Sequence, residues 1–335
     1  MMSTLRVFFT LSIYAMALTG IAQNNWKFTH ITPDQGLSTG TVNCTFTDSR
    51  GFVWIGTMDG LNRYDGYKLK VFRNIQGDST SISGNVITSL AEDAKGRIWA
   101  GIRNGGISIF DWQDETFTQI EQGEEPGMLP NATVKQIIIN ENEALMALQG
   151  AGLVIYDLHK GEFEVLTHDP DNPNSISSNT VLSILPDGKD NYWIGSHANA
   201  IDRFNLKTKA FTHFTYDPAY RPDQINRKPL LKDSQGNLWI GTDGAGAIRF
   251  EIATGKFEYF TINNGLSLAI ITAFYENESG NIMIGTDGRG IDIYNPETRE
   301  FSNMKSSLLD TESLSSDAIY EIREDESGVI WISTF

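Results

Sequence analysis

The sequence is short of cysteine and of positive charge, and each shortage excludes something. Cys44 is the single cysteine among 335 residues, so no disulfide can form within the chain. Its place in the alternating stretch Val42, Cys44, Phe46 predicts a small buried side chain. Basic side chains number 26 against 42 acidic ones, a formal charge of −16. An acidic surface repels phosphate backbones, so we expect no nucleic-acid partner.

Long apolar runs are equally scarce. Val7 to Leu18 is too short to span a bilayer comfortably, and it follows the basic residue Arg6. Small residues at Gly20 and Ala22 then predict cleavage after Ala22, so we expect a signal peptide over residues 1–22 and a periplasmic mature chain. No cysteine follows the cleavage site, which argues against a lipid anchor. No later run approaches ~18 apolar residues, so we expect no membrane contact.

Aromatic residues are plentiful, and they recur at a fixed interval. In each of six units, one apolar residue is followed 18 positions later by phenylalanine (72 − 54, 117 − 99, and so on). The pairs are Trp54 and Phe72, Trp99 and Phe117, Leu145 and Phe163, Trp193 and Phe211, Trp239 and Phe257, and Met283 and Phe301. Their first members recur at steps of 45, 46, 48, 46 and 44, and then 48 to Trp331. Self-similarity at this period, with several short strands per unit, predicts a β-propeller.

One unit shows how each blade is built. Alternation predicts strands at Val86 to Leu90, Ile98 to Gly101 and Ile107 to Phe110, and Phe117 marks a fourth, outer strand. An Asp-x-x-Gly turn beginning at Asp93 joins the first two strands. Because this aspartate recurs in most units, we interpret it as structural. Two units depart from the pattern: the third has leucine for tryptophan, and the fifth begins with Arg-Lys-Pro (227–229) where apolar alternation is expected.

The ends of the chain predict how the ring closes. A seventh unit begins at Ala318 and reaches Phe335, while Trp26 to His30 resembles an outer strand without a blade. We therefore predict an all-β fold over residues 23–335: a seven-bladed β-propeller of four-stranded blades, its last blade truncated and closed by the N-terminal strand. We also expect the fragment to be less stable than a version extended by about 20 residues, which would supply the missing strand.

A search for catalytic and metal-binding motifs finds little. The five histidines form no metal-ligand spacing, and no Gly-x-Ser-x-Gly motif occurs. The glycine-rich segment 285–290 joins two strands instead of opening a helix, and the acidic segment 169–174 lacks the glycine and glutamate of an EF-hand. We expect no cofactor, no metal and no catalytic residue.

The loops between the second and third strands are the best candidates for a binding site. In propellers they share one face with the loops between blades, and both surround a mouth of the central channel. Their residues break the turn consensus differently in each unit, as ligand-binding positions on a repetitive scaffold would. The candidates, able together to bind sugar hydroxyls or a uronate carboxylate, are Asp59, Arg103, Asn104, Gln149, His197, Asn199, Asp243, Asp287 and Arg289. Arg103 and Arg289 are the strongest.

The repeat itself resembles a known family. Leu-Ser-x-x-x-Val, then Asp-Ser-x-Gly-x-Leu-Trp-Ile-Gly-Thr-x-x-Gly-Leu-x-Arg-Tyr, is similar to the two-component regulator propeller repeat, and it stands here at Gly36 to Tyr64 and Asp233 to Phe250. The resemblance implies the periplasmic sensor region of a Bacteroidetes hybrid histidine kinase. Its implied partners are an oligosaccharide ligand, the remaining propeller and immunoglobulin-like domains of the full-length sensor, and a second copy in a homodimer. The full-length protein would be anchored in the inner membrane, and no kinase core is present in this chain.

Three functions stay open at this point. The resemblance favours a non-catalytic sensor of glycan breakdown products that regulates polysaccharide-utilisation genes. A second hypothesis is a protein-interaction propeller without a small ligand. A third is a propeller glycosidase or lyase, which requires paired carboxylates roughly 5–10 Å apart across the channel mouth. Asp59, Asp243 and Asp287 are the residues available for such a pair.

Overall fold

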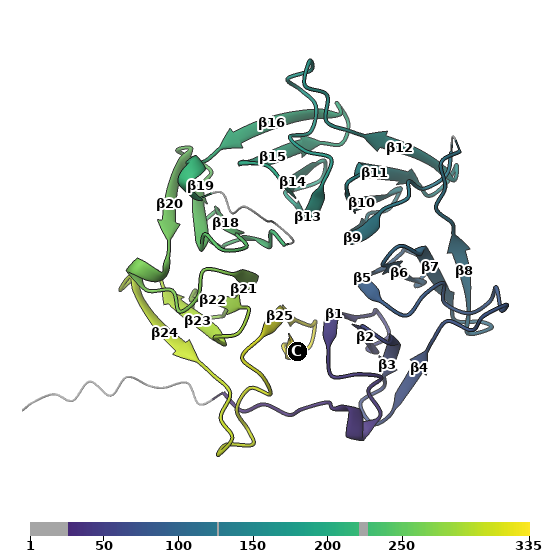
Figure 1. Cartoon of the computed structure of the whole chain (residues 1–335), viewed down its shortest axis with the longest axis horizontal. Helices are drawn as coiled ribbons and strands as arrows, with labels where there is room; N and C mark the ends of the chain where they lie inside the picture. The colour runs from purple at the N-terminus through teal and green to yellow at the C-terminus, as the bar shows by residue number, and fades with distance from the viewer. Residues whose placement is uncertain (1–25, 126, 221–226) are drawn as a thin grey trace, which may run out of the picture.

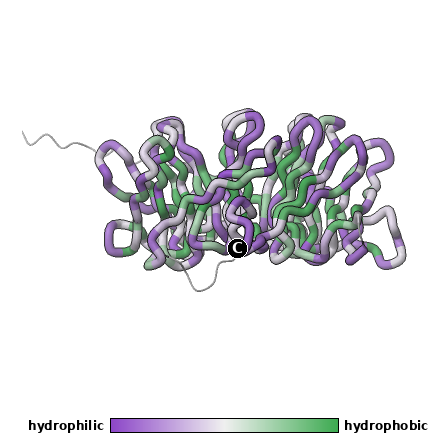
Figure 2. Tube along the Cα trace, turned by 90° about the horizontal axis from the view of Figure 1, so that it is seen from above, coloured by the Kyte–Doolittle hydropathy of each residue, from purple (hydrophilic) through white to green (hydrophobic). Residues whose placement is uncertain are grey.

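The chain folds into a ring of radial β-sheets (Figure 1). The computed structural model describes residues 26–125, 127–220 and 227–335. Within these ranges the helices are three single 3-10 turns, η1 (Pro33–Gln35), η2 (Pro218–Tyr220) and η3 (Ile262–Asn264). Seen edge-on, the molecule is a disc with polar loops at its rims and apolar strand segments between them (Figure 2). The predicted signal peptide lies outside the described residues.

Six blades each contain four antiparallel strands, numbered outward from the centre of the ring. Blade one comprises β1 (Val42–Thr47), β2 (Val53–Thr57), β3 (Gly60–Tyr64) and β4 (Leu69–Phe72). Blade two comprises β5 (Ile87–Glu92), β6 (Ile98–Ile102), β7 (Gly106–Asp111) and β8 (Thr116–Ile120). Blade three comprises β9 (Thr133–Ile139), β10 (Glu143–Gln149), β11 (Gly152–Asp157) and β12 (Glu162–Leu166). Blade four comprises β13 (Val181–Pro186), β14 (Asn191–Ser196), β15 (Ala200–Asn205) and β16 (Ala210–Thr215). Blade five comprises β17 (Leu230–Lys232), β18 (Asn237–Gly241), β19 (Ala247–Glu251) and β20 (Lys256–Phe260). Blade six comprises β21 (Ile271–Glu276), β22 (Ile282–Thr286), β23 (Ile291–Asn295) and β24 (Glu300–Met304).

The prediction of seven four-stranded blades is wrong. The structure has six, and the seventh sheet contains two strands, β25 (Ile319–Glu324) and β26 (Ile330–Thr334). The segment expected to be its outer strand is irregular: Phe28 donates its backbone N–H to the carbonyl of Glu312 at 2.9 Å, and Trp26 and Phe28 pack against the apolar cluster beneath. The reason is that an outer strand needs a third strand to pair with, and none stands beside β26 in the part of the chain that is described.

Side chains, not a shared sheet, close the ring between β25 and blade one. The partly buried Glu321 carboxylate accepts hydrogen bonds from the backbone N–H of Thr45 at 2.6 Å and from its hydroxyl at 2.8 Å. Arg323 donates to the carbonyl of Thr45 at 3.3 Å and lies 4.8 Å from the ring centre of Phe46. Burial raises the pKa of Glu321 above its ordinary value, with the charge of Arg323 opposing it. The join therefore rests on these partly buried polar contacts and on the packing of Trp331 against the apolar cluster of blade one.

The repeated aspartate of the first turn is structural, as predicted. In blade five the Asp233 carboxylate accepts from the backbone N–H of Asn237 at 2.7 Å and from the indole N–H of Trp239 at 2.9 Å. The same bond joins three further pairs: Asp48 to Trp54, Asp93 to Trp99, and Asp325 to Trp331. Each buried indole would otherwise lack an acceptor, so the turn and the core are one unit.

The exceptions follow the same logic. The two blades with Leu145 or Met283 in place of tryptophan have Asn140 or Asn277 at the turn, where the side chain accepts from backbone N–H groups alone. A neutral acceptor is enough when no indole must be satisfied. In blade four the turn carboxylate, Asp187, is instead paired with Arg203 and Lys232. The indole nitrogen of Trp193 in that blade has no hydrogen-bond partner in the described structure.

The core lies between neighbouring blades. Trp54, Trp193 and Trp239 are 0% exposed, and Cys44 is 7% exposed. Burial raises the pKa of the Cys44 thiol well above its ordinary value, which disfavours the reactive thiolate. The expectation of a small buried side chain at this position is confirmed.

Candidate ligand-binding channel

A central cavity of about 530 Å³ runs between the inner strands of the blades. In most inner strands one residue near the start falls in a register shift, so it is unpaired in the ladder and available to the channel. These residues, all of which line the cavity, are Asn43, Thr88, Leu182, Thr272 and Tyr320. Lys135 lies in the equivalent position of β9, between the paired residues Val134 and Gln136.

One mouth of this channel is surrounded by the loops between the second and third strands, and we call it the loop mouth. Each loop is held by the segment that leads into the next blade. Gly60 donates its backbone N–H to Asn85 at 2.7 Å, Gly152 donates to Asn179 at 2.7 Å, and Gly290 donates to Asp317 at 2.8 Å. The predicted arrangement, with these loops and the inter-blade connections on one face, is confirmed.

Most of the predicted binding residues take part in building these loops. Asp59 forms an ion pair with Arg73 at 3.0 Å, and the Asn199 amide donates to the carbonyl of Tyr216 at 2.7 Å. Asn104 has a φ of 54° and accepts a hydrogen bond from Thr133 at 3.1 Å. These contacts use polar groups that a ligand would need, so they favour a structural role for the three side chains.

The remaining candidates lie at the seams between blades. Three of them bridge to the segment that leads into the next blade: Gln149 with Thr180, Asp243 with Ile270, and Asp287 with Ala318. His197 donates its backbone N–H to the carbonyl of Thr180 at 2.8 Å, in the segment that leads into its own blade. Arg289 donates its backbone N–H to the hydroxyl of Thr286 at 3.1 Å. Of the nine candidates, only Arg103 lines the cavity. A shared ligand contact for the nine stays a prediction.

Sequence reasoning missed the residues that line the loop mouth from the inner strands: Lys135, Arg227, Lys228 and Tyr320. The signal was present in blade five, where basic residues replace the apolar alternation of an inner strand. A second signal is that Lys135 occupies a position held by asparagine, threonine or leucine in blades one, two, four and six. Both deviations were visible only by aligning the inner strands with one another.

The charges at this mouth influence one another. Burial lowers the pKa of Lys135, and the positive charges of Arg227 and Arg103 lower it further. The guanidinium of Arg227 lies over the ring of Tyr320, 4.0 Å from its centre. Burial lowers the pKa of Arg227 as well, while Tyr320 and the carboxylates of Asp287 and Asp243 oppose that change. Lys135 therefore lies close enough to Arg103 and Arg227 to be repelled by both.

Lys228 is different, because its ammonium is fully used. It is 2% exposed and donates to the carbonyls of Ser196 at 3.0 Å, Ala198 at 3.0 Å and Ala200 at 2.7 Å. All three carbonyls belong to the loop between β14 and β15, so a lysine of blade five holds a loop of blade four. Burial lowers the pKa of Lys228 to about 7. We interpret it as a structural tether.

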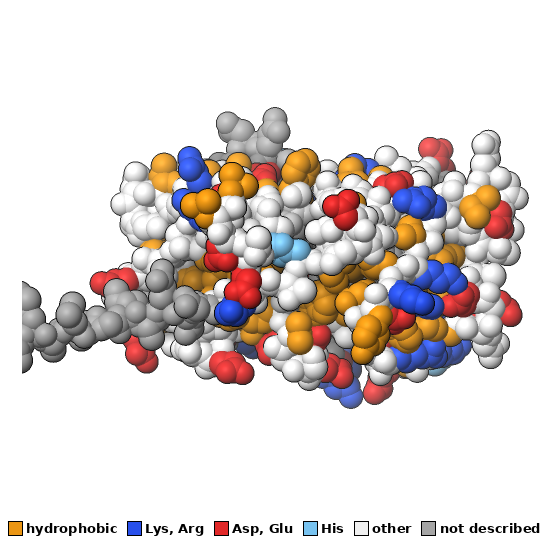
Figure 3. Space-filling model, turned by 90° about the horizontal axis from the view of Figure 1, so that it is seen from below, with side chains coloured by type: hydrophobic (Ala, Val, Ile, Leu, Met, Phe, Trp, Pro, Cys, Tyr) orange, Lys and Arg blue, Asp and Glu red, His pale blue; other side chains and the backbone are white. Residues whose placement is uncertain are grey.

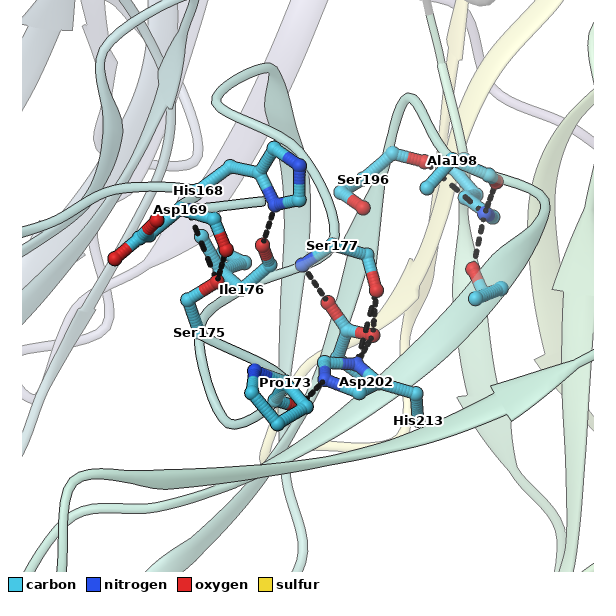
Figure 4. Close-up of polar contacts among 12 residues, drawn as sticks. His168, Asp169, Pro173, Ser175, Ile176, Ser177, Ser196, Ala198, Asp202 and His213 are labelled. Carbon is cyan, nitrogen blue, oxygen red and sulfur yellow. Dashed lines mark hydrogen bonds and ion pairs between the residues drawn. The ribbon is translucent and has the colours of Figure 1, made fainter. Parts of the chain in front are cut away.

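A serine, a histidine and an aspartate meet beside β15, and their geometry decides whether they are catalytic (Figure 4). The Nδ1 atom of His213 lies 2.7 Å from Asp202 Oδ1 and 2.9 Å from Ser177 Oγ, while Nε2 lies 3.0 Å from the carbonyl of Pro173. In a catalytic triad the acid and the nucleophile contact different ring nitrogens. Here both contact the same one, so the histidine cannot pass a proton between them.

The rest of this cluster is a repeated structural feature. Ser177 donates its backbone N–H to Asp202 at 2.9 Å, and equivalent serines before other inner strands do the same with the third strand of their own blade. The equivalents are Ser38 to Asn62, Ser83 to Ser108, and Ser267 to Asp292. This serine therefore fixes the entry to blades one, two, four and six.

We expect Ser177→Ala to lower the free energy of unfolding by about 1 kcal/mol, because buried Asp202 loses one hydroxyl donor and keeps its backbone donor. Urea unfolding of the purified chain measures this. Ser178→Ala is the matched control, since that hydroxyl accepts only from the N–H of Thr180. Equal stability of both variants would contradict the structural role of Ser177.

Within residues 26–125, 127–220 and 227–335, no cluster of three or more His, Cys, Asp and Glu side chains is placed to hold a metal ion. Over the same ranges, no helix has the length and hydropathy needed to cross a bilayer.

Comparison with known proteins agrees with the repeat pattern. The family model described as "Two component regulator propeller" matches residues 36–59, 81–104 and 223–244. Histidine kinase P4 of Formosa agariphila is 42% identical over 83 residues, which are 24% of this chain and 6% of that kinase.

Solved structures are similar over nearly the whole chain. The extracellular domain of a putative hybrid two-component system of B. thetaiotaomicron superposes with a TM-score of 0.76 at 23% identity, covering 92% of this chain and 40% of that one. A second such domain from that organism superposes with a TM-score of 0.75 at 23% identity, covering 92% of this chain and 38% of that one. PorZ is a surface component of the type-IX secretion system of Porphyromonas gingivalis. It superposes with a TM-score of 0.62 at 14% identity, covering 88% of this chain and 46% of that one. The chain thus spans less than half of each of these structures. Three segments of the chain match the two-component regulator propeller model, and its fold is similar to that of these extracellular domains.

Proposed function

We propose that this chain is the extracellular, non-catalytic ligand-sensing propeller of a hybrid two-component system. The observation that carries the proposal is the combination of family repeats with the fold of two such extracellular domains over 92% of the chain. The ligand would be an oligosaccharide released from a polysaccharide, and the loop mouth of the channel is the proposed place of contact. The chain would be exported by its N-terminal segment and work on the periplasmic side of the inner membrane.

The mechanism we propose is a shift between two arrangements of the whole sensor. Ligand contact at the loop mouth would stabilise one arrangement of a dimeric ectodomain, and the membrane-spanning part of the full-length protein would carry that bias inward. A ligand shifts such an equilibrium only by its differential affinity for the two states. The partners of this chain would therefore be the remaining propeller and immunoglobulin-like domains and a second copy of the sensor.

Deleting the gene in its native host tests the proposal. We expect the deletion to abolish induction of one polysaccharide-utilisation gene set on one polysaccharide and to leave growth on simple sugars unchanged, because only the signal is lost. Transcript levels across a panel of polysaccharides measure this, with the wild-type gene restored as the control. Identical transcript profiles of the deletion and wild-type strains on every polysaccharide would overturn the sensory function.

A further inference from the structure

Three cations line the loop mouth of a strongly acidic protein. Arg103 comes from the loop between β6 and β7 in blade two, Lys135 from β9 in blade three, and Arg227 from the approach to β17 in blade five. All three line the same cavity, although the chain has a net charge of −16. On the part of the outer wall shown in Figure 3, acidic and basic side chains are instead interspersed with apolar ones. Positive charge is therefore concentrated inside the channel.

Among the residues that the structure describes, none of these three cations forms an ion pair. Within the described ranges, Lys135 forms no hydrogen bond or ion pair, and the one side-chain contact of Arg103 is with the sulfur of Met58 at 3.8 Å. Arg227 rests on Tyr320. By contrast, Arg73 and Arg249 each pair with a carboxylate. Lys135 and Arg227 are partly buried and form no ion pair in the described part of the chain, and an anion between them lowers the cost of burying these charges.

The cavity has the size and chemistry of a small-ligand site. Its volume of about 530 Å³ lies within the range of roughly 300–1,000 Å³ typical of such sites. Tyr320 offers an aromatic face and a hydroxyl, and Asn43 and Thr88 add polar groups to the same wall. The lowered pKa of Lys135, caused by burial and by its two cationic neighbours, supports the absence of a nearby compensating acid. The carboxylates of Asp243 and Asp287 oppose the lowering of the Arg227 pKa, whereas no acid does so for Lys135.

We propose that the loop mouth binds an anionic oligosaccharide through Arg103, Lys135 and Arg227, with the carboxylate or sulfate group of the sugar between Lys135 and Arg227. This inference rests on the proposed sensory function and specifies its ligand class. Arg103, on an exposed loop, contacts the part of the ligand that projects from the channel. Arginine matches a planar carboxylate or a sulfate with paired N–H groups, and lysine adds a point charge.

Isothermal titration calorimetry on the purified chain tests the ligand class directly. The probes are an oligogalacturonate, a sulfated oligosaccharide of the same length, a neutral oligosaccharide of the same length, and inorganic sulfate. We expect one of the two charged oligosaccharides to bind at least about tenfold more tightly than the neutral one, since charge-assisted hydrogen bonds provide that difference. We also expect its affinity to fall at high salt. Preference between the two charged probes identifies carboxylate or sulfate as the recognised group.

Two variants locate the site. Lys135→Gln and Arg227→Gln are each expected to weaken the charged probe about tenfold or more and to leave the melting temperature equal or higher, because like-charge repulsion is removed. Lys256→Gln, on the outer strand β20 and outside the channel, is the matched control and is expected to bind as the wild type does. A loss of affinity with unchanged folding separates a binding role from a structural one.

Several outcomes would overturn the inference. Equal affinity for neutral and charged oligosaccharides, or full affinity in both channel variants, would show that the three cations do not recognise the ligand. Absence of binding by every probe, including sulfate, would do the same. None of these results touches the gene-deletion test, so the sensory function and the anionic ligand class fail independently.

Discussion

Asp233→Ala is expected to lower the free energy of unfolding by about 3 kcal/mol, since it leaves buried donors without an acceptor. The side chain is 8% exposed and accepts from the backbone N–H of Asn237, from its side-chain amide at 3.0 Å, and from the indole of Trp239. Alanine provides no acceptor, and water cannot reach an indole that is 0% exposed. Urea unfolding followed by tryptophan fluorescence measures the change.

The chain provides its own control for this substitution. Asn277→Ala removes the equivalent side chain of blade six, where the acceptor serves the backbone N–H groups of Ser279 and Asn281 and no indole is present. We expect it to cost about 1 kcal/mol. Asp233→Asn should lower the free energy of unfolding by an amount between those of the two alanine variants. Its amide keeps one acceptor oxygen, but its NH₂ group faces donors such as the buried indole N–H. Equal losses for the two alanine variants would show that the indole bond contributes nothing.

Lys228→Met is the second substitution with a large expected effect, again about 3 kcal/mol. Methionine fills much of the same space, but three carbonyls between Ser196 and Ala200 lose the ammonium on which they converge. The loop between β14 and β15 is then held by fewer contacts, and the seam between blades four and five opens more easily. Hydrogen exchange in this loop, combined with urea unfolding, measures both consequences. Lys256→Met, on the surface, is the control and should change stability little.

The pH dependence of the same lysine has a definite sign. Burial lowers its pKa to about 7 in the folded chain, whereas the unfolded chain keeps the ordinary value of 10.5; the charge of Asp202 acts in the opposite direction. Between these values the unfolded state holds more protons, so the contribution of Lys228 to stability rises with pH. The loss caused by Lys228→Met should therefore be larger at about pH 9 than at about pH 6. An equal loss at both values would contradict the lowered pKa.

The sequence predicts the blades well because the features that form them are local. The interval from Trp54 to Phe72 spans three neighbouring strands, and Asp48 and Trp54 belong to one turn and the strand after it, so their spacing survives any change in the loops between blades. Ring closure is not local. Pairing of Trp26 to His30 with a seventh blade requires a third strand, and resemblance of sequence to an outer strand cannot replace that partner. This segment is therefore held without a strand ladder, by apolar packing and by polar contacts with Glu312 and Ser313.

The binding site was only partly accessible to sequence reasoning for a related reason. Loop residues such as Asp59 and Asn199 stood out because they vary between repeats, but their side chains are used to hold the loops. Lys135 was not identified because it lies within a strand. In a sequence of alternating apolar and polar residues, a single polar residue is expected to face the solvent. Only the register shift in β9 and the radial arrangement of the blades show that this position faces the channel.

The hydrogen bonds that hold the loop mouth come largely from backbone groups, notably of Gly60, Gly152 and Gly290. A peptide N–H is present whatever the neighbouring side chain, so the residue types at the tips of these loops can be exchanged without removing the bonds that fix them. The ring could therefore serve as a scaffold for engineered binding. Residues at a few loop positions could be changed to create different binding surfaces while the framework stays the same. Randomising Met58, Arg103, Gln149, His197 and Arg289 together should yield variants with new ligands more often than variants that fail to fold.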